Sequence, residues 1–215
     1  MPADNLTITE MLVDFRREGV RLAYARTPCG ARAETAAAQA GGQLVSRRVT
    51  YIADLHHDHG IDSPPTFDIA PFVGPLTPTL ESLALASGAY SRFRVDPQMP
   101  QSVFDLLYRT WIRKSVTGEL AERVFVARVQ GIECGMVTVA EEGERGTIGL
   151  MAVAEGERGR GVGRALVRCV RQHHLAMGRQ IVQVVTQHSN RSACTFYENV
   201  GFRVERIEAE YHFWL

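Results

Sequence analysis

The sequence predicts an α/β (α+β) protein in which helices flank a mixed, mostly antiparallel sheet, with a small α/β extension at the N-terminus. Three observations support this fold class. Three successive strand patterns are joined by short turns. A glycine-rich loop follows them and opens an amphipathic helix. A polar stretch at 56–65, HHDHGIDSPP, ends in two prolines and separates these elements from an earlier helix–strand–helix–strand pattern.

The composition bounds the class of protein. The chain has 215 residues, enough for one large or two small domains. Lys plus Arg equals Asp plus Glu at 24 each, so no net field attracts nucleic acid or a membrane. No apolar run approaches the roughly 20 residues of a spanning helix, and the first residues lack a signal-peptide pattern. Four cysteines without a CxxC pair are typical of a reducing compartment. We expect a cytoplasmic protein.

The first segment, 1–55, has alternating helix and strand patterns. Apolar residues at helical spacing begin it, and Gly41-Gly42 ends an alanine-rich run. The patterns place helices at Leu6–Glu18 and Ala31–Ala40, and strands at Val20–Ala25 and Leu44–Leu55. A unit of about 55 residues is marginal alone, so it is expected to pack on the rest. In the linker 56–65, His56, His57 and His59 indicate a surface loop rather than a metal site.

The second segment, 66–215, contains the remaining elements. A short strand at 67–69 precedes helices at Thr79–Ala86 and Gln101–Val116. The strands are then Arg123–Val129, Cys134–Ala140 and Thr147–Val153. After the glycine loop come a helix at Val162–Ala176, a strand at Ile181–Val185, a helix at Asn190–Asn199 and two last strands, Phe202–Ile207 and Glu210–Leu215.

An internal similarity links the two segments. AGGQLVSRRVTYIADL at 40–55 and VGFRVERIEAEYHFWL at 200–215 share a layout, with Gly41, Tyr51 and Leu55 matching Gly201, Tyr211 and Leu215. A helix followed by glycine and a strand is a common arrangement, which is the alternative explanation. The similarity favours a first segment that is a degenerate half-copy of the second.

The stretch EGERGRGVGRAL at 155–166 is suited to binding an anion. The first amides of a helix have no intrahelical partner, and the helix dipole favours negative charge there. Glycines let a ligand approach the backbone closely, and Arg158 and Arg160 add positive charge. A P-loop would need GxxxxGK[ST], and a dinucleotide fingerprint would need GxGxxG. Neither occurs here.

The loop and a second motif together indicate a family. Arg158-x-x-Gly161-x-Gly163 resembles motif A of the GCN5-related N-acetyltransferases (GNAT). SNRSACTFYENVGF at 189–202 resembles their motif B. The matching positions of motif B are Asn190, Ala193, Phe196, Tyr197, Gly201 and Phe202. The resemblance covers residues 67–215, and the elements follow the family order.

The resemblance implies a cosubstrate and a set of binding residues. Acetyl-CoA is the expected cosubstrate, with no metal. Its pyrophosphate would meet the loop amides, and its pantetheine arm would pair with the preceding strand, which splays from the strand near Val184. The expected cofactor-binding residues are Met151, Ala152, Val153, Arg158, Gly159, Arg160, Gly161, Val162, Gly163 and Asn190. Asn190 also fits a helix N-cap.

The resemblance assigns one catalytic residue and leaves the general base open. Tyr197 matches the family tyrosine that points at the CoA sulfur, so it is expected to protonate the leaving thiolate. A half-buried structural tyrosine is the alternative. Glu141, Glu142 and Asp96 lie near segments that border the acceptor cleft in this family, and none of them is assigned as the base. The free amine can also lose its proton through water.

The acceptor is expected to be a small amine. GAYSRFRVDPQMPQSVFDLLYRTWIRKSV at 88–116 resembles the corresponding stretch of dTDP-fucosamine (dTDP-4-amino-4,6-dideoxygalactose) N-acetyltransferases. This implies a nucleotide-linked amino sugar, with Ser91 and Arg94 as acceptor-binding residues. The alternatives are protein or peptide N-acetylation and a non-catalytic acyl-CoA sensor. No nucleic-acid or membrane partner is expected, and a homodimer is left open.

Overall fold

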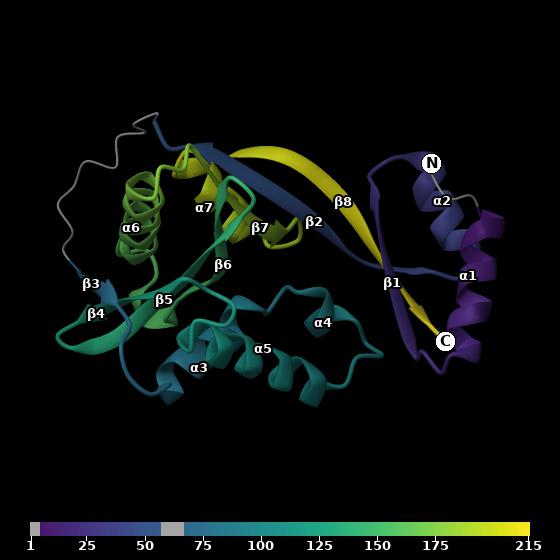
Figure 1. Ribbon diagram of the computed structural model, residues 1–215, viewed down its shortest axis with the longest axis horizontal. Coiled ribbons are helices and arrows are strands. Elements are labelled where there is room, and N and C mark those ends of the chain that lie inside the picture. The colour runs from purple at the N-terminus through teal and green to yellow at the C-terminus, as the bar shows by residue number, and fades with distance from the viewer. Residues whose placement is uncertain (1–4, 57–66) are drawn as a thin grey trace.

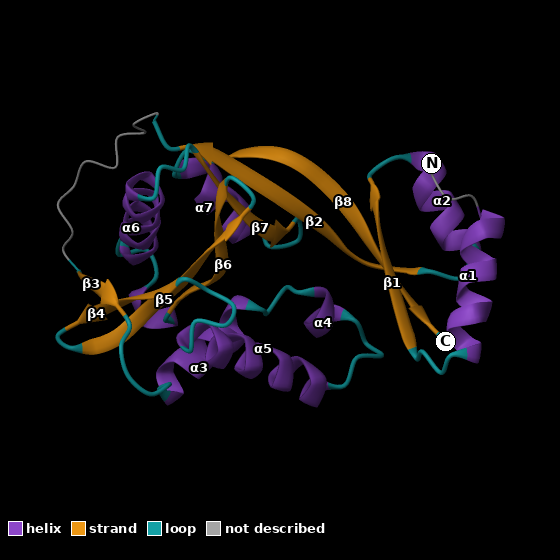
Figure 2. Ribbon diagram, in the orientation of Figure 1, coloured by secondary structure: helices purple, strands orange, loops and turns teal. Residues whose placement is uncertain are grey.

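The computed structural model describes residues 5–56 and 67–215, in which eight strands form one sheet (Figures 1 and 2). The strand order is β1-β8-β2-β7-β6-β5-β4-β3. The strands are β1 Leu22–Pro28, β2 Gln43–Asp54, β3 Asp68–Pro71, β4 Arg123–Val129, β5 Ile132–Glu142, β6 Arg145–Val153, β7 Ile181–Gln187 and β8 Arg203–Trp214. The helices are α1 Asn5–Arg17, α2 Ala31–Gln39, α3 Pro78–Ser87, α4 Arg92–Val95, α5 Gln101–Val116, α6 Val162–Ala176 and α7 Arg191–Asn199, with a 3-10 turn at Glu155–Glu157.

The two faces of the sheet carry different helices. Alternation along β4 shows this, because Phe125 and Ala127 belong to the core under α6 and α7, whereas Val124 and Val126 belong to the core under α3 and α5. A third apolar cluster packs α1 and α2 on β8, on the same face as Ala209 and Phe213. The face opposite α1 and α2 is therefore free to carry polar side chains.

The last strand corrects one prediction. Two strands were expected, at 202–207 and 210–215, but β8 is continuous from Arg203 to Trp214. The acidic residues in its middle have arginine partners from neighbouring strands, Glu208 with Arg48 and Glu210 with Arg26. Because both carboxylates are paired, the polar residues continue the ladder instead of forming a turn.

The strand β2 lies inside the sheet, between β7 and β8. Its residues Val49, Tyr51 and Ala53 belong to the main core. The N-terminal segment therefore contributes a central strand to the sheet. The predicted linker at 56–65 lies outside the described residues except for His56, so the division of the chain into domains stays a prediction.

The ladder between β2 and β8 has a symmetric register. Both strands have 12 residues, and corresponding positions are 160 residues apart. Pairs that exchange under this offset are Gln43↔His212 with Ile52↔Arg203, and Leu44↔Tyr211 with Tyr51↔Val204. The two register irregularities, at Val45 and at Glu205, also correspond. The ladder is symmetric about the pair Arg48↔Glu208, as expected for two copies of one strand.

The flanking helices follow the same offset. The helices α2 and α7 both have nine residues, and each precedes a glycine in the left-handed region. These glycines are Gly41 at φ 86° and Gly201 at φ 87°. Tyr51 Oη donates to Glu198 on α7 at 2.8 Å, and the equivalent Tyr211 Oη donates to Glu34 on α2 at 3.4 Å. Each unit thus places its last strand under the helix of the other. The repeat inferred from the sequence stays a prediction, and it would account for this correspondence.

Within the described residues, no helix is both long and apolar enough to cross a membrane.

Candidate active site

A gap between two parallel strands is the first feature of the site. The strands β6 and β7 pair only from Gly146↔Val182 to Ile148↔Val184, although β6 continues to Val153 and β7 to Gln187. A register shift in β6 precedes the separation, and Leu150 N donates to Thr138 Oγ1 at 2.8 Å there. The part of β6 that carries Met151, Ala152 and Val153 therefore has no ladder partner on β7. This is where the sequence analysis expected the two strands to splay.

The glycine loop leads directly into the amides that begin α6. Gly161 is the N-cap residue at φ 94°, and Gly159 has φ 77°, so both need the left-handed region that glycine tolerates. No side chain of the described residues caps this end, and the first turn of α6 contains no acidic residue. The amides of Val162 and Gly163 are thus available to an external acceptor. A Cβ atom on Gly163 would lie 3.2 Å from the Phe196 ring.

The two loop arginines have local partners. Arg158 Nε donates to the carbonyl oxygen of Val153 at 3.1 Å, and Arg160 Nη1 lies 2.8 Å from Glu157 Oε2. Arg158 therefore links the loop to the end of β6, while part of the charge of Arg160 is offset by Glu157. The stretch 158–163, predicted to bind the pyrophosphate, is thereby joined to the end of β6, which is predicted to bind the pantetheine arm.

Tyr197 lies at the wall of a cavity beside the gap. It is on α7, 6% exposed, and its Oη donates to Met151 Sδ at 3.7 Å. Burial raises the pKa of Tyr197, so the phenol keeps its proton at neutral pH. A weakly hydrogen-bonded, protonated phenol next to β6 can donate to a group that enters between the strands.

Asn190 has the capping role that the sequence predicted. Its Oδ1 accepts from Ala193 N at 3.1 Å at the start of α7. It also lines the cavity, next to Gln187 at the end of β7. The cap uses the side-chain oxygen and leaves the amide nitrogen as a donor toward the cavity.

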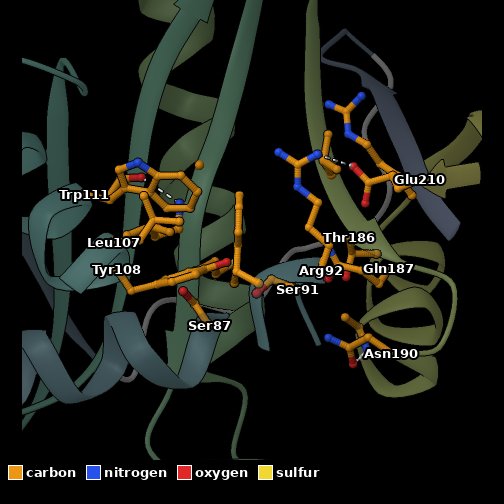
Figure 3. A pocket seen from close by; sticks show the side chains of 18 of the residues that line it. Ser87, Ser91, Arg92, Leu107, Tyr108, Trp111, Thr186, Gln187, Asn190 and Glu210 are labelled. Carbon is orange, nitrogen blue, oxygen red and sulfur yellow. Dashed lines mark hydrogen bonds and ion pairs between the residues drawn. The ribbon is translucent and has the colours of Figure 1, made fainter. Parts of the chain in front are cut away.

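The cavity has a volume of ≈ 690 Å³ and two unlike walls. In Figure 3, Tyr108 and Trp111 lie on one side and Thr186, Gln187 and Glu210 on the other, with Ser91 and Arg92 between them. Tyr108 and Trp111 are stacked edge to face at 4.9 Å on α5. One wall is therefore aromatic, and the other is polar and charged.

The structure places Ser91 at the cavity, as predicted, but it places Arg92 there instead of Arg94. Arg92 is 7% exposed, and its guanidinium lies 3.8 Å from the centroid of the Tyr24 ring. The guanidinium of Arg94 lies over Phe104 at 5.6 Å, outside the cavity lining. Because Arg92 and Arg94 are two positions apart on one helical turn, their side chains point in nearly opposite directions. The packing of Arg92 on Tyr24 turns Arg92 toward the cavity.

The lining residues that sequence reasoning missed include a charged and aromatic group from β1, β2 and β8. This group consists of Tyr24 and Arg26 on β1, Arg48 on β2 and Glu210 on β8. A signal was present, since the run AYAR at 23–26 in β1 alternates alanine with larger polar residues. Ala23 and Ala25 pack under α1 and α2, so Tyr24 and Arg26 face the other side of the sheet.

The three carboxylates considered as bases are engaged elsewhere. Asp96 contacts His212 and Trp214 in a buried cluster, Glu141 pairs with Arg179, and Glu142 accepts from Gln183 Nε2 at 2.6 Å. None of the three is among the lining residues. Among the described residues, Glu210 is the carboxylate that lines the cavity, and it is bonded to Arg26 at 3.0 Å.

One group of potential metal ligands occurs among the described residues. Ligand atoms of Glu122, His173 and His174 lie within 4.8 Å of one another. The two histidines are in the last turn of α6, at the opposite end from the glycine loop, and the group lies outside the cavity lining. The expectation of a reaction without metal stays a prediction.

Comparison with known proteins agrees with this geometry. Residues 121–204 match the family model described as "Acetyltransferase (GNAT) domain". The chain is 26% identical over 152 residues to the "Spore coat polysaccharide biosynthesis protein SpsD" of Bacillus subtilis, a match that covers 71% of this chain and 52% of that protein. The chain thus spans about half the length of this curated relative.

Two solved structures are similar over nearly the whole chain. A GCN5-related N-acetyltransferase from Sphaerobacter thermophilus has 19% identity and a TM-score of 0.65, covering 97% of this chain and 68% of that one. A functionally unknown conserved protein from Staphylococcus epidermidis has 13% identity and a TM-score of 0.67, covering 100% and 82%. The fold, including the N-terminal unit, is therefore shared with solved proteins.

Proposed function

We propose that this chain, whose residues 121–204 match a GNAT acetyltransferase domain, is an N-acetyltransferase that transfers an acetyl group from acetyl-CoA to the primary amine of a small acceptor. The observation that carries the proposal is the position of Tyr197, whose Oη lies beside Met151 on β6 where β6 and β7 separate. The glycine loop that begins α6 follows the same strand.

The residues fit acetyl-CoA along this path. The uncapped amides at the start of α6 suit a pyrophosphate, and the unpaired edge of β6 at 151–153 suits the amide groups of a pantetheine arm. Asn190 lies on the opposite side of the gap. The acetyl end would then reach the cavity beside Tyr197.

In the proposed reaction, the nitrogen of a neutral amine attacks the thioester carbonyl carbon. The new C–N bond forms and the C–S bond breaks. The phenol of Tyr197 donates its proton to the departing sulfur, and the surplus proton of the nitrogen passes to water. The products are the N-acetylated acceptor and CoA with a free thiol. Tyr197 regains a proton from solvent.

The preferred acceptor is a nucleotide-linked amino sugar. The aromatic wall at Tyr108 and Trp111 suits a planar or apolar group, and the charged wall suits an anion. SpsD is named for spore coat polysaccharide biosynthesis, and its likeness to this chain agrees with a sugar acceptor. A basic peptide is disfavoured, since Arg26, Arg48 and Arg92 line the cavity.

The test is release of CoA thiol from acetyl-CoA in the presence of amines of different classes. Amino sugars and their nucleotide-linked forms are expected to give turnover, whereas lysine-containing peptides are not. Thermal-shift binding of acetyl-CoA separates a protein that binds acetyl-CoA from a scaffold that does not, and thiol release separates an enzyme from a sensor. A chain that binds acetyl-CoA but releases no thiol with any amine would indicate a sensor and overturn the proposal.

A further inference from the structure

Three arginines from separate parts of the chain meet on one side of the cavity. Arg26 lies on β1, Arg48 on β2 and Arg92 on α4, and all three line the cavity. These three arginines have only two carboxylate partners. Glu210 lies 3.0 Å from Arg26 and 3.8 Å from Arg92. Glu208 lies 3.1 Å from Arg48. Glu208 is itself shared with Arg206 at 3.3 Å. Positive charge therefore exceeds negative charge on this wall.

The most buried of the three has an unused donor. Arg92 Nη1 is buried and makes no hydrogen bond among the described residues, because Glu210 Oε1, the oxygen with which it forms an ion pair, lies 3.8 Å away. Tyr24 and Phe93 hold the plane of the guanidinium, with ring centroids at 3.8 and 4.6 Å. A buried N–H without an acceptor is unfavourable, so this position favours an incoming anion. A fixed guanidinium fork matches the oxygens of a phosphate.

Mutual repulsion adds to this preference. Burial lowers the pKa of Arg48, and the neighbouring charge of Arg26 lowers it further. Arg48 nevertheless remains charged at neutral pH, because the guanidinium is a very weak acid. An anion placed between Arg26 and Arg48 would relieve the repulsion, as the two carboxylates do only in part.

We propose that this wall binds a phosphate or diphosphate group of the acceptor, so that the N-terminal unit determines acceptor class. The inference rests on the proposed function and adds to it the residues that bind the anionic group and the role of the N-terminal unit in choosing the acceptor. Arg26 and Arg48 come from strands of the N-terminal unit, and the β1–β8 register places Arg26 opposite Glu210 and Tyr24 opposite His212. The aromatic wall lies across the cavity, where a group beyond the phosphate would be in contact with Tyr108 and Trp111.

The first experiment measures anion binding by the full chain, using inorganic pyrophosphate and uridine diphosphate in calorimetric titrations. Both are expected to bind wild-type protein, with affinity that falls as salt rises. Arg26→Gln and Arg92→Gln are expected to weaken binding about tenfold or more, as for a lost charge-assisted hydrogen bond. Arg32→Gln is the matched control, because Arg32 is an exposed arginine on α2 of the same unit. It should change the affinity less than twofold.

Acetyl-CoA binding by each variant serves as the second measurement. Unchanged acetyl-CoA affinity shows that the variant is folded and that the proposed function is intact. If Arg92→Gln fails to fold, Arg26→Gln decides, because its side chain is 42% exposed. If the wild-type protein binds acetyl-CoA but neither anion, the inference is overturned while the proposed function still stands. Equal anion affinity in wild type and Arg26→Gln would also overturn the inference. Tighter binding of uridine diphosphate than of pyrophosphate would support a nucleotide over a simple phosphate.

Discussion

Arg48 and Glu208 occupy equivalent positions in β2 and β8, 160 residues apart, and they face each other in the ladder between those strands. Arg48 Nη1 lies 3.1 Å from Glu208 Oε2. The register repeats in reverse on either side of this pair. Arg48 also lines the cavity, so one side chain belongs both to the centre of the repeat and to the wall of the site.

Reversing the charge of Glu208 tests the structural part of this pairing. Glu208→Arg would place like charges opposite each other and is expected to lower the free energy of unfolding by about 1 kcal/mol. The double variant Arg48→Glu/Glu208→Arg should recover most of that loss, measured by denaturant unfolding. The affinity of the double variant for pyrophosphate should be lower than that of the wild type, because position 48 on the cavity wall no longer carries a guanidinium. Additive effects of the two substitutions would argue against the pairing.

Removing the hydroxyl of Tyr197 tests the proposed proton donor. Tyr197→Phe keeps the buried ring and is expected to lower kcat about a hundredfold, as for loss of a general acid. The KM for acetyl-CoA should change little, because the substitution leaves the proposed pyrophosphate site at the glycine loop unaltered. Steady-state thiol release measures both constants. Tyr90→Phe, at an exposed tyrosine outside the cavity lining, is the control. An unchanged kcat in Tyr197→Phe would exclude the role.

A carboxylate at Gly163 tests the proposed pyrophosphate site. Gly163→Glu brings negative charge to the first turn of α6, and its Cβ would press on the Phe196 ring at 3.2 Å. Acetyl-CoA affinity is expected to fall at least about tenfold, measured by calorimetry. Gly156→Ala is the matched control, since Gly156 faces open space and has no left-handed φ. Intact affinity in Gly163→Glu would place the CoA anchor elsewhere.

The buried cluster around Asp96 predicts acid sensitivity. Asp96 Oδ2 lies 2.6 Å from His212 Nδ1 and accepts from Trp214 Nε1 at 3.0 Å. Burial alone would raise the pKa of this carboxyl, but the bonds from His212, the Gln98 amide and Trp214 outweigh burial and leave the pKa below its ordinary value. A lowered pKa contributes stability above the unfolded value, and the contribution is lost as the pH falls below about 4.

Asp96→Asn is accordingly expected to cost about 3 kcal/mol of unfolding free energy at pH 7. Its difference from wild type should shrink below about pH 4, where the wild-type carboxyl gains its proton. Urea unfolding at several pH values measures this. Asp105→Asn, at a half-buried position on α5 outside this cluster, is the control. A constant difference across the whole range would show that Asp96 does not act through its charge.

The sequence alone determined the local features of this protein. Apolar periodicity located the helices and strands, because each depends on residues a few positions apart. Gly41 and Gly201 marked helix ends, and Asn190 marked a helix start, since those conformations favour particular residue types. The loop at 158–163 and Tyr197 were predicted as site residues through the resemblance of two short motifs to those of the GNAT family. The similarity of 40–55 to 200–215 predicted a repeat, and the symmetric ladder between β2 and β8 agrees with that prediction.

Only the tertiary structure decided the features that depend on pairing between residues far apart in the sequence. The exchange of β2 and β8 between the two units joins residues 160 positions apart, and no local pattern specifies which of two similar strands lies beside β7. That exchange brings Arg26 and Arg48 to a cavity whose other walls come from residues 87–210. The choice of Arg92 over Arg94 depends on the Tyr24 ring, which reaches α4 only in the assembled fold. Side-chain direction there follows from packing, which a short motif does not encode.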